Sequence, residues 1–571
     1  MKRLLSLTLV LICAAASYGA SPKIAPDLLN VGQNSSVNAI VQYQQAPSPG
    51  GLLQVLNLGG LLQQVLSPVT ALIHIPVASL TQLVADPNVI YVSPDRSVAG
   101  SLDYAEPTIN ANVAYSKGFN GQGIGIAVID SGVTDELDLH NSSLLNLFSR
   151  ISYSESFVPG DQSTKDAYGH GTHVAGILAG NASKSTGPLY THTFLGIAPS
   201  SNVINLRVLD SNGLGTDSAV IAAINRAVSL KNSYNVRVIN LSLGRPIFES
   251  YLFDPLCAAV EQAWRAGIVV VVAAGNLGRD NSFGNYGYAT ITSPGNDPYV
   301  ITVGAMKDQG TLTRSDDTIA SYSSKGPTMI DHIVKPDVVA PGNHIVSLLA
   351  SSQAGLLQAA TTVPRSYYVW GGTGAASTDY LNLSGTSMAT PMVSGTAALM
   401  LQRDNTLSPD TVKARIMKSA TKQFPTSSVV VDNGAVYTDF YDIFTVGAGY
   451  LDAWAALGST DVASGSAMSP VATWNDGSVQ IVNGNPAYGQ VAIWGNAAVW
   501  GSAAVWGSNV TLGDGLLGDA VVWGAAAVWG SSVPDGNAVW GSAAIWGNAA
   551  IWGNSTTTSG ESFSALTGGE R

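Results

Sequence analysis

The pattern of apolar and polar positions divides the chain into stretches of different character, the first of which covers residues 21–100. Residues 37–43 alternate as a strand does, and residues 88–92 fit a second strand that ends at residues 93–95. Between them, residues 79–84 fit a short helix begun by a Ser79 cap. These patterns predict a small α+β unit.

The middle stretch, residues 101–459, alternates continuous apolar runs with helical segments. Residues 125–129 and 268–273 are apolar runs bounded by turn residues, which is typical of strands buried on both faces. Residues 218–230 and 257–266 carry the helical period. The alternation predicts an α/β domain with a parallel sheet and helices on both faces.

The last stretch, residues 460–571, contains a repeat in which Trp is followed by Gly. Nine of the 12 Trp residues lie here, and eight of them are followed by Gly, at positions 494, 500, 506, 523, 529, 540, 546 and 552. A spacing of six keeps them on one side of a strand but spreads them around a helix. The repeat therefore predicts a β-solenoid, with breaks at residues 508–522 and 531–539. A low-complexity, partly disordered tail is the alternative.

Residues 1–20 have the layout of a secretory signal peptide. Lys2 and Arg3 precede an apolar run over residues 4–16, which small and polar residues 17–20 follow. This run is shorter than the roughly 18–20 residues that cross a bilayer, so a permanent membrane anchor is the weaker alternative. We therefore expect a secreted protein, extracellular or at the cell surface.

Composition narrows the function classes further. The chain has 26 Lys and Arg against 38 Asp and Glu, a net charge of −12, whereas a nucleic-acid-binding protein needs a basic face. Nucleic acid is therefore not an expected partner. Cys13 and Cys257 are too few for a disulfide framework or a thiolate metal cluster.

Two segments of the middle stretch carry candidate acid–base chemistry. Asp130 ends an apolar strand before a Gly turn, where catalytic groups collect in α/β sheets, although an Asp there also serves as a turn cap. His170 lies between two glycines just before a small-residue helix, so its ring can stand clear and act as a general base. His173, one turn further on, is interpreted as structural, because the spacing and the Glu of a zinc-binding His pair are missing.

A third segment supplies a candidate nucleophile. Ser387 follows Gly385 and Thr386 at the start of a helix that runs through Leu401. Backbone N–H groups at a helix N-terminus favour a developing oxyanion, although a lone Ser there is most often a cap. A hydroxyl becomes a nucleophile when a base takes its proton and a carboxylate orients that base. Together the three segments supply such a set.

At these motifs the sequence resembles the subtilisin-like serine proteases (subtilases), whose catalytic residues follow the chain order Asp, His, Ser. The resemblance covers about residues 124–457 and implies a subtilisin-like fold for residues 101–459. It assigns catalytic roles to Asp130, His170 and Ser387 in a secreted endopeptidase of broad specificity. The enzyme would hydrolyse peptide bonds in protein or peptide substrates through an acyl-enzyme intermediate.

The resemblance also implies roles for residues outside the triad. Asn276, after an apolar strand that ends Ala-Ala-Gly-Asn, is expected in the oxyanion hole. Ser242, Leu243 and Gly244 are expected to bind the substrate backbone as an added strand. Leu277 after Asn276 predicts a preference for an apolar substrate side chain.

No cofactor is implied for catalysis, whereas structural calcium remains open and its ligands are unknown. Asp138 is a candidate ligand by position, but Asp135, Glu136 and Asp138 fit a solvated turn better because calcium-loop spacing is missing. Residues 350–382 are longer than in compact members of the family, so we expect them to reshape the cleft or to add a lid.

By the same resemblance, residues 21–100 are similar to an inhibitory propeptide that the enzyme itself removes. Cleavage is expected between Arg96 and Ala105. A template of this kind suits a large parallel sheet, which folds slowly because its pairings are distant in sequence. The precursor would then be a zymogen whose own propeptide is an inhibitory partner.

Two other functions remain open at this point. In the first, residues 460–571 are the working module of a surface or matrix protein, whose Trp rows contact cell-surface material or glycans. In the second, the chain is a catalytically dead scaffold. The complete triad together with Asn276 counts against the second.

Overall fold

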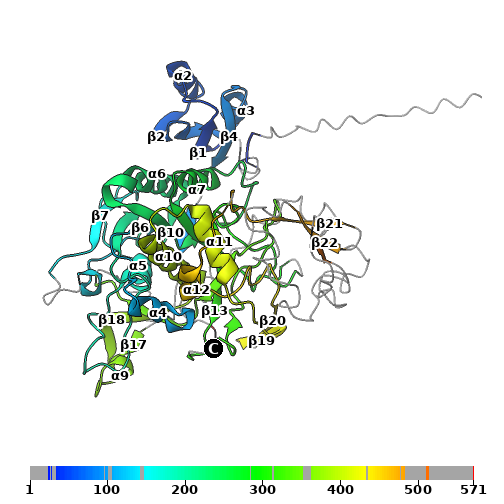
Figure 1. Ribbon diagram of the computed structural model, residues 1–571. Helices are drawn as coiled ribbons and strands as arrows, with labels where there is room; N and C mark the ends of the chain where they lie inside the picture. The colour runs from blue at the N-terminus through cyan, green and yellow to red at the C-terminus, as the bar shows by residue number, and fades with distance from the viewer. Residues whose placement is uncertain are drawn as a thin grey trace, which may run out of the picture. The chain divides into compact units, whose positions relative to one another are not determined.

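The computed structural model describes residues 23–25, 28, 32, 34–94, 97–100, 106–141, 147–282, 285–311, 314–351, 362–432, 435–463, 465–475, 478–482, 510–512 and 570 (Figure 1). Two compact units are formed, Met1–Gln64 with Val69–Pro94, and Val65–Pro68 with Asp95–Arg571. The predicted signal peptide lies outside the described residues. So do all eight Trp-Gly steps of the repeat.

The first unit is built on a four-stranded sheet in the order β2-β3-β1-β4. Its elements are β1 (Ser36–Tyr43), α2 (Pro49–Asn57), β2 (Leu61–Ser67), β3 (Thr70–Pro76), α3 (Leu80–Leu83) and β4 (Val89–Pro94). The α+β pattern was predicted, but two details differ. Ser79 does not cap α3, because its Oγ donates to the carbonyl of Leu58 at 2.8 Å. Strand β4 also runs through Pro94, so it includes two of the three residues that were expected to end it.

The second unit contains a sheet in the order β14-β13-β12-β10-β6-β8-β7, with β15 beside β13. Its strands are β6 (Gly125–Asp130), β7 (Ile151–Ser156), β8 (Asn202–Arg207), β10 (Val236–Leu241), β12 (Val269–Ala273), β13 (Ile301–Lys307), β14 (Thr318–Ile319) and β15 (Val338–Pro341). All neighbours pair in parallel except β13 and β14, which are antiparallel. The sheet is therefore mixed, where a parallel one was predicted.

Helices cover this sheet, and their bounds are α4 (Ala111–Ser116), α5 (His170–Ala179), α6 (Asp217–Tyr234), α7 (Pro255–Arg265), α10 (Thr386–Arg403), α11 (Pro409–Ser419) and α12 (Ala453–Gly458). Helices α6 and α7 pack on each other and on the sheet, and so do α5 and α10. Figure 1 shows the two pairs on opposite sides of β6 and β10. Strands β6 and β12 are buried along their whole length, as their unbroken apolar runs predict.

Smaller sheets surround the large one. They use β5 (Ser97–Gly100), β9 (Gly215–Thr216), β11 (Leu243–Gly244), β16 (Ile345–Leu348), β17 (Thr362–Pro364), β18 (Ala376–Leu383), β19 (Ser427–Asp432), β20 (Ala435–Phe440), β21 (Val471–Asn475), β22 (Ser478–Val482) and β23 (Val510–Leu512). The extra segment before the candidate nucleophile supplies β17, α9 (Arg365–Tyr368) and β18, and β18 lies between β16 and β17 in a three-stranded sheet. Its Tyr380 packs edge-on against Phe194, with ring centroids 4.7 Å apart.

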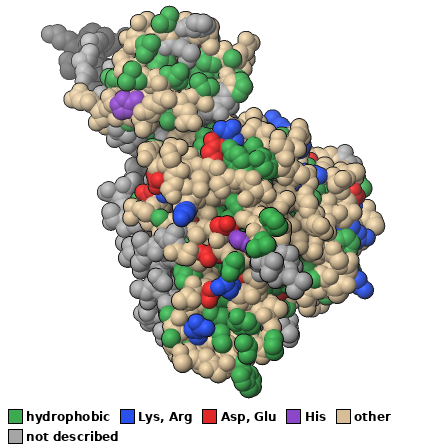
Figure 2. All heavy atoms as spheres, turned by 90° about the vertical axis from the view of Figure 1, so that its left-hand side faces the viewer, with side chains coloured by type: hydrophobic (Ala, Val, Ile, Leu, Met, Phe, Trp, Pro, Cys, Tyr) green, Lys and Arg blue, Asp and Glu red, His purple; other side chains and the backbone are tan. Residues whose placement is uncertain are grey.

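Charged side chains are few on the surface drawn in Figure 2, and acidic and basic groups are intermixed there. Most of that face consists of backbone and uncharged side chains, in keeping with the 11% of charged residues in the sequence. Within the part of the chain that the structure describes, no helix is both long enough and apolar enough to cross a membrane.

Candidate active site

The carboxyl ends of three neighbouring strands carry the first set of candidate residues. Strand β6 ends at Asp130, Ser242 follows the last residue of β10, and Asn276 lies three residues after β12. These strands are adjacent and parallel in the order β12-β10-β6, so their carboxyl ends meet at the same edge of the sheet. The topology thus assembles residues that are far apart in sequence.

Asp130 and His170 form a buried pair. His170 Nδ1 lies 2.5 Å from Asp130 Oδ1, and both side chains are inaccessible to solvent. The carboxylate accepts the Nδ1 proton, which makes Nε2 the basic end of the ring. The expectation that the ring stands clear of its neighbours is wrong, because His170 is buried and the ring centroid of Tyr168 lies 6.3 Å away.

His173 is also buried, as its interpretation as a structural residue requires. Its Nε2 lies 3.2 Å from the carbonyl oxygen of Leu381, and burial lowers its pKa well below the ordinary range. A neutral imidazole is therefore part of the packing between α5 and β18.

Asp166 positions the start of α5, and sequence analysis missed it. Its carboxylate accepts hydrogen bonds from Gly169 N at 2.6 Å, Thr172 N at 2.8 Å and Ser131 Oγ at 2.8 Å. Ser131 Oγ in turn accepts a bond from Gly171 N at 2.9 Å. A carboxylate is therefore placed at the N-terminus of α5 and linked to the residue after β6. The sign of this role in the sequence is that Asp166 lies four residues before the candidate base, His170.

Ser387 is the second residue of α10, as predicted for a nucleophile at a helix start. Its Oγ donates to the carbonyl of Ser242 at 3.0 Å, and its own carbonyl accepts from Ser242 Oγ at 2.6 Å. Asn240 holds Ser242 from the other side, since its Nδ2 lies 3.0 Å from Ser242 Oγ. Ser394, two turns along α10, donates to Asn240 Oδ1 at 2.8 Å and completes the network.

Asn276 is oriented by the first residue of α10. Its Oδ1 accepts hydrogen bonds from Thr386 N at 2.9 Å and from Thr386 Oγ1 at 3.0 Å. Because a backbone N–H can only donate, this bond fixes which end of the amide is oxygen and makes Nδ2 the donor end. Thr386 Oγ1 also accepts from Gly275 N at 3.1 Å. Sequence analysis quoted Thr386 only as a neighbour of Ser387 and missed this role.

A peptide strand can bind beside the predicted substrate segment. Strand β5 lies between β11 and β9 and is antiparallel to both. In this register Ala99 pairs with Gly244 and Gly100 pairs with Leu243. The two predicted residues of β11 thus form a sheet edge that pairs with an extended chain. The opposite edge, β9, was not predicted.

Asp138 does not lie in a solvated turn, so that interpretation is wrong for it. The side chain is buried and accepts hydrogen bonds from Ser183 Oγ at 2.8 Å, Lys184 N at 2.9 Å and Tyr380 OH at 2.6 Å. Burial raises its pKa. Three protein donors occupy this carboxylate, so it does not fit the role of a calcium ligand. Asp135, by contrast, is exposed.

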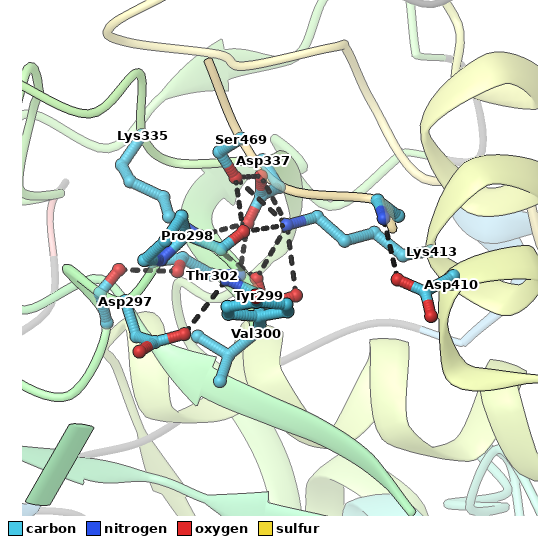
Figure 3. Close-up of polar contacts among 12 residues, drawn as sticks. Asp297, Pro298, Tyr299, Val300, Thr302, Lys335, Asp337, Asp410, Lys413 and Ser469 are labelled. Atoms are coloured by element: carbon cyan, nitrogen blue, oxygen red, sulfur yellow. Dashed lines mark hydrogen bonds and ion pairs between the residues drawn. The ribbon is translucent and has the colours of Figure 1, made fainter. Parts of the chain in front are cut away.

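Among the residues that the structure describes, no group of three or more His, Cys, Asp or Glu side chains is arranged to hold a metal ion. A lysine side chain does fill an oxygen-lined site (Figure 3). Lys413 Nζ on α11 donates to three successive backbone carbonyls, those of residues 298–300, at 2.8–3.1 Å. It also donates to Ser469 Oγ at 2.9 Å.

Asp337 joins this lysine to a second one. Its Oδ1 lies 3.3 Å from Lys413 Nζ and its Oδ2 lies 2.7 Å from Lys335 Nζ, with all three side chains fully buried. Burial by itself raises the pKa of Asp337, but the two ammonium groups outweigh it and hold the pKa below its ordinary value. We call Lys335, Asp337 and Lys413 the lysine cluster.

Comparison with known proteins agrees with this geometry. The model described as "Subtilase family" matches residues 121–437. Serine protease AprX of Bacillus subtilis (strain 168) is 36% identical over 345 residues, which cover 59% of this chain and 70% of AprX. Subtilisin E of the same organism is 35% identical over 347 residues, 60% of this chain and 73% of that protein. Subtilisin of Bacillus pumilus is 36% identical over 324 residues, which cover 57% of this chain and 93% of that protein.

Proposed function

This chain belongs to the subtilase family of serine endopeptidases, and we propose that it is secreted as a self-processing precursor that hydrolyses extended protein segments with a catalytic triad of Asp130, His170 and Ser387. The observation that carries the proposal is the 2.5 Å contact between His170 Nδ1 and Asp130 Oδ1. It lies at the start of α5, which packs against the helix that begins beside Ser387.

In the proposed mechanism, Ser387 Oγ attacks the carbonyl carbon of the scissile bond while its proton passes to His170 Nε2. Asp130 keeps the Nδ1 proton in place and stabilises the imidazolium. When the tetrahedral intermediate collapses, the C–N bond breaks and His170 gives the proton to the leaving amine. Water then attacks the acyl carbon while its proton passes to His170 Nε2. The bond between the acyl carbon and Ser387 Oγ breaks, His170 returns the proton to Ser387 Oγ, and the carboxylic acid is released.

The oxyanion of the tetrahedral intermediate would accept hydrogen bonds from Asn276 Nδ2 and from the backbone N–H of Ser387. Thr386 supports this role, because it holds Asn276 Oδ1 and so fixes the direction of the amide. Donors that are oriented before the reaction need no reorganisation as charge develops.

Substrate would bind as a strand between β9 and β11, as β5 does. Main-chain pairing recognises the extended backbone of a substrate and not its side chains. This mode of binding supports broad specificity. The apolar preference predicted from Leu277 belongs to this proposal as well.

Strand β5 also suggests where the precursor is cut. Gly100, the last residue of β5, pairs with Leu243, which directly follows Ser242 in the chain. The Ser242 carbonyl lies 3.0 Å from Ser387 Oγ. We therefore propose cleavage between residues 101 and 102, inside the predicted range of 96–105. N-terminal sequencing of the mature chain tests this, and a start at any residue other than Leu102 contradicts the register.

The decisive experiment compares Ser387→Ala with Thr396→Val. Both changes remove a buried hydroxyl from α10, but Thr396 Oγ1 bonds to the carbonyl of Met392 in the same helix. We expect Ser387→Ala to lower kcat on casein by ~10⁶-fold and to abolish both self-cleavage and labelling by a serine-directed inhibitor. Thr396→Val should retain all three. Casein hydrolysis by Ser387→Ala within tenfold of the parent would exclude Ser387 from the mechanism.

Export is tested separately. The intact mass of the chain recovered from the medium of a culture that secretes it should lack residues 1–20. Recovery of the protein only inside cells, or with residues 4–16 still attached, would contradict secretion through a cleaved signal peptide.

A further inference from the structure

Glu570 follows the Trp-Gly repeat in sequence, yet it is fully buried in the second unit. Its Oε2 accepts hydrogen bonds from Ser321 N at 2.8 Å and Ser321 Oγ at 2.5 Å. Arg279 Nη2 lies 3.3 Å from the same oxygen. The carboxylate is thus bound by one cation and two neutral donors, a set that recognises an anionic side chain.

The backbone of the same residue is bound by a single side chain. Glu570 N donates to Asn343 Oδ1 at 2.8 Å, and Asn343 Nδ2 donates to the carbonyl of Glu570 at 3.0 Å. Asn343 is itself buried. An amide that pairs with both the N–H and the C=O of one residue recognises peptide backbone, so backbone and carboxylate are bound together.

Other residues hold the binding groups in place. Arg279 Nε donates to Ser321 Oγ at 2.8 Å, and Arg279 Nη1 pairs with Asp432 at 2.7 Å. The ring of Tyr437 lies under the guanidinium, 4.6 Å from its carbon. The arginine therefore has partners on the β19-β20 hairpin besides Glu570, which keeps the site in shape.

We propose that Arg279, Ser321 and Asn343 form a receptor for a glutamyl residue of a peptide segment, and that Glu570 occupies it and fastens the far end of the Trp-Gly repeat to this unit. The chain just before the repeat is attached to the same unit as well. Ala472 N at the start of β21 donates to the carbonyl of His332 at 2.8 Å. The repeat therefore lies, in sequence, between two attached residues. Such attachment raises the local concentration of the glutamyl residue at its receptor.

The test cuts the chain after it has folded. In a Ser387→Ala background, residues 554–559 are replaced by the recognition sequence of a site-specific protease, and the purified chain is cut there. Gel filtration with intact-mass analysis then measures how fast residues 560–571 leave the rest of the protein. Because no step uses hydrolysis by this chain, the result is independent of the proposed catalytic function.

Glu561 gives a matched control, since it is the other glutamate of the released segment. We expect the parent segment and Glu561→Gln to stay bound, and Glu570→Gln to dissociate at least about tenfold faster, because a buried hydrogen-bonded charge is lost. Equal rates for the two variants, or immediate release of the parent segment, would overturn the proposal.

A peptide experiment covers the case in which Glu570→Gln fails to fold. A synthetic peptide of residues 560–571 is titrated into the cut parent chain to displace its own segment. We expect the same peptide with Glu570→Gln to need at least about tenfold more for half displacement, and the Glu561→Gln peptide to match the parent. Equal displacement by all three peptides would also contradict the proposal that this site is a receptor for Glu570.

Discussion

The candidate active site and the lysine cluster are both buried and polar, but they are built differently. In the lysine cluster, the hydrogen bonds of Lys413 converge on the cation from carbonyls, a hydroxyl and a carboxylate (Figure 3). In the active site, hydrogen bonds fix one end of two side chains that we propose to be functional. Asp130 binds Nδ1 of His170, and Thr386 binds Oδ1 of Asn276.

This difference separates stability from reactivity. A lysine cation whose hydrogen bonds go to protein oxygens is not available to bind a substrate. Removing one member of the lysine cluster leaves an uncompensated buried charge. When a hydrogen bond fixes one end of a planar side chain, it also fixes the direction of the other end. That other end is Nε2 of the imidazole or Nδ2 of the amide. We therefore expect substitutions in the active site to lower turnover while the fold persists. We expect substitutions in the lysine cluster to lower stability while turnover per folded molecule persists.

Among the changes that test this comparison, Asp130→Asn is expected to have the largest effect. The Asn amide can donate to Nδ1, which a carboxylate cannot do. The ring is then no longer held in the tautomer that leaves Nε2 basic, and we expect kcat to fall by ~10⁴-fold. Asp135→Asn is the control, because Asp135 also contacts a histidine, His140, at 3.1 Å but is exposed. Steady-state kinetics should show its kcat within twofold of the parent. A loss in Asp130→Asn no greater than in Asp135→Asn would contradict the role of Asp130.

Asp337→Asn is expected to act on stability. Burial lowers the pKa of Lys413 to about 7, so the comparison is made at pH 6, where this lysine is protonated. The buried cations lose their carboxylate, so we expect the free energy of unfolding to fall by ~3–5 kcal/mol, measured by urea unfolding in a Ser387→Ala background. The pKa of Asp337 is held below its ordinary value of 3.8, so its contribution is present above that pH and is lost as pH falls further. The difference between parent and variant should shrink in acid.

The kinetic control completes that comparison. In an active background, kcat per folded molecule of Asp337→Asn should equal that of the parent, because the lysine cluster presents no group to the substrate. A large drop in kcat with unchanged unfolding would show that the two regions are not separate in function.

The positions of the catalytic candidates could be predicted because each chemical group and its local structure share one short segment. Asp130 ends its own strand, and His170 and Ser387 lie at the starts of their own helices. The meeting of Asp130, Ser242 and Asn276 at one sheet edge follows from the parallel pairing of their strands. The burial of His170 could not be predicted, because it depends on how the surrounding chain packs.

Residues that act through distant partners were missed or misinterpreted for the same reason. Lys413 is bound by carbonyls more than 110 positions earlier in the chain, and its own helix gives no sign of them. Asp138 looked solvated because its hydroxyl partners, Ser183 and Tyr380, are 45 and 242 positions away. Periodicity identifies which face of an element is buried, but it does not identify which polar group satisfies another across the core.

Asn276→Ala is expected to have the next largest effect. It removes a proposed donor to the oxyanion, so kcat should fall by ~10²–10³-fold with a small change in KM, since the donor acts on charge that develops after binding. Thermal unfolding should shift little, because the change leaves Asn240 and the lysine cluster intact. A rise in KM with kcat unchanged would instead place Asn276 in substrate binding.

Thr386→Val is expected to have the smallest effect and gives the sharpest test of how the active site is built. The change keeps the Thr386 N–H bond to Asn276 Oδ1 and removes the hydroxyl bond at 3.0 Å. The amide then has one anchor in place of two, so we expect kcat to fall by about tenfold while KM stays within twofold. Thr386→Ser restores the hydroxyl and should restore kcat. If Thr386→Ser is as slow as Thr386→Val, packing of the methyl group and not orientation of the amide explains the effect.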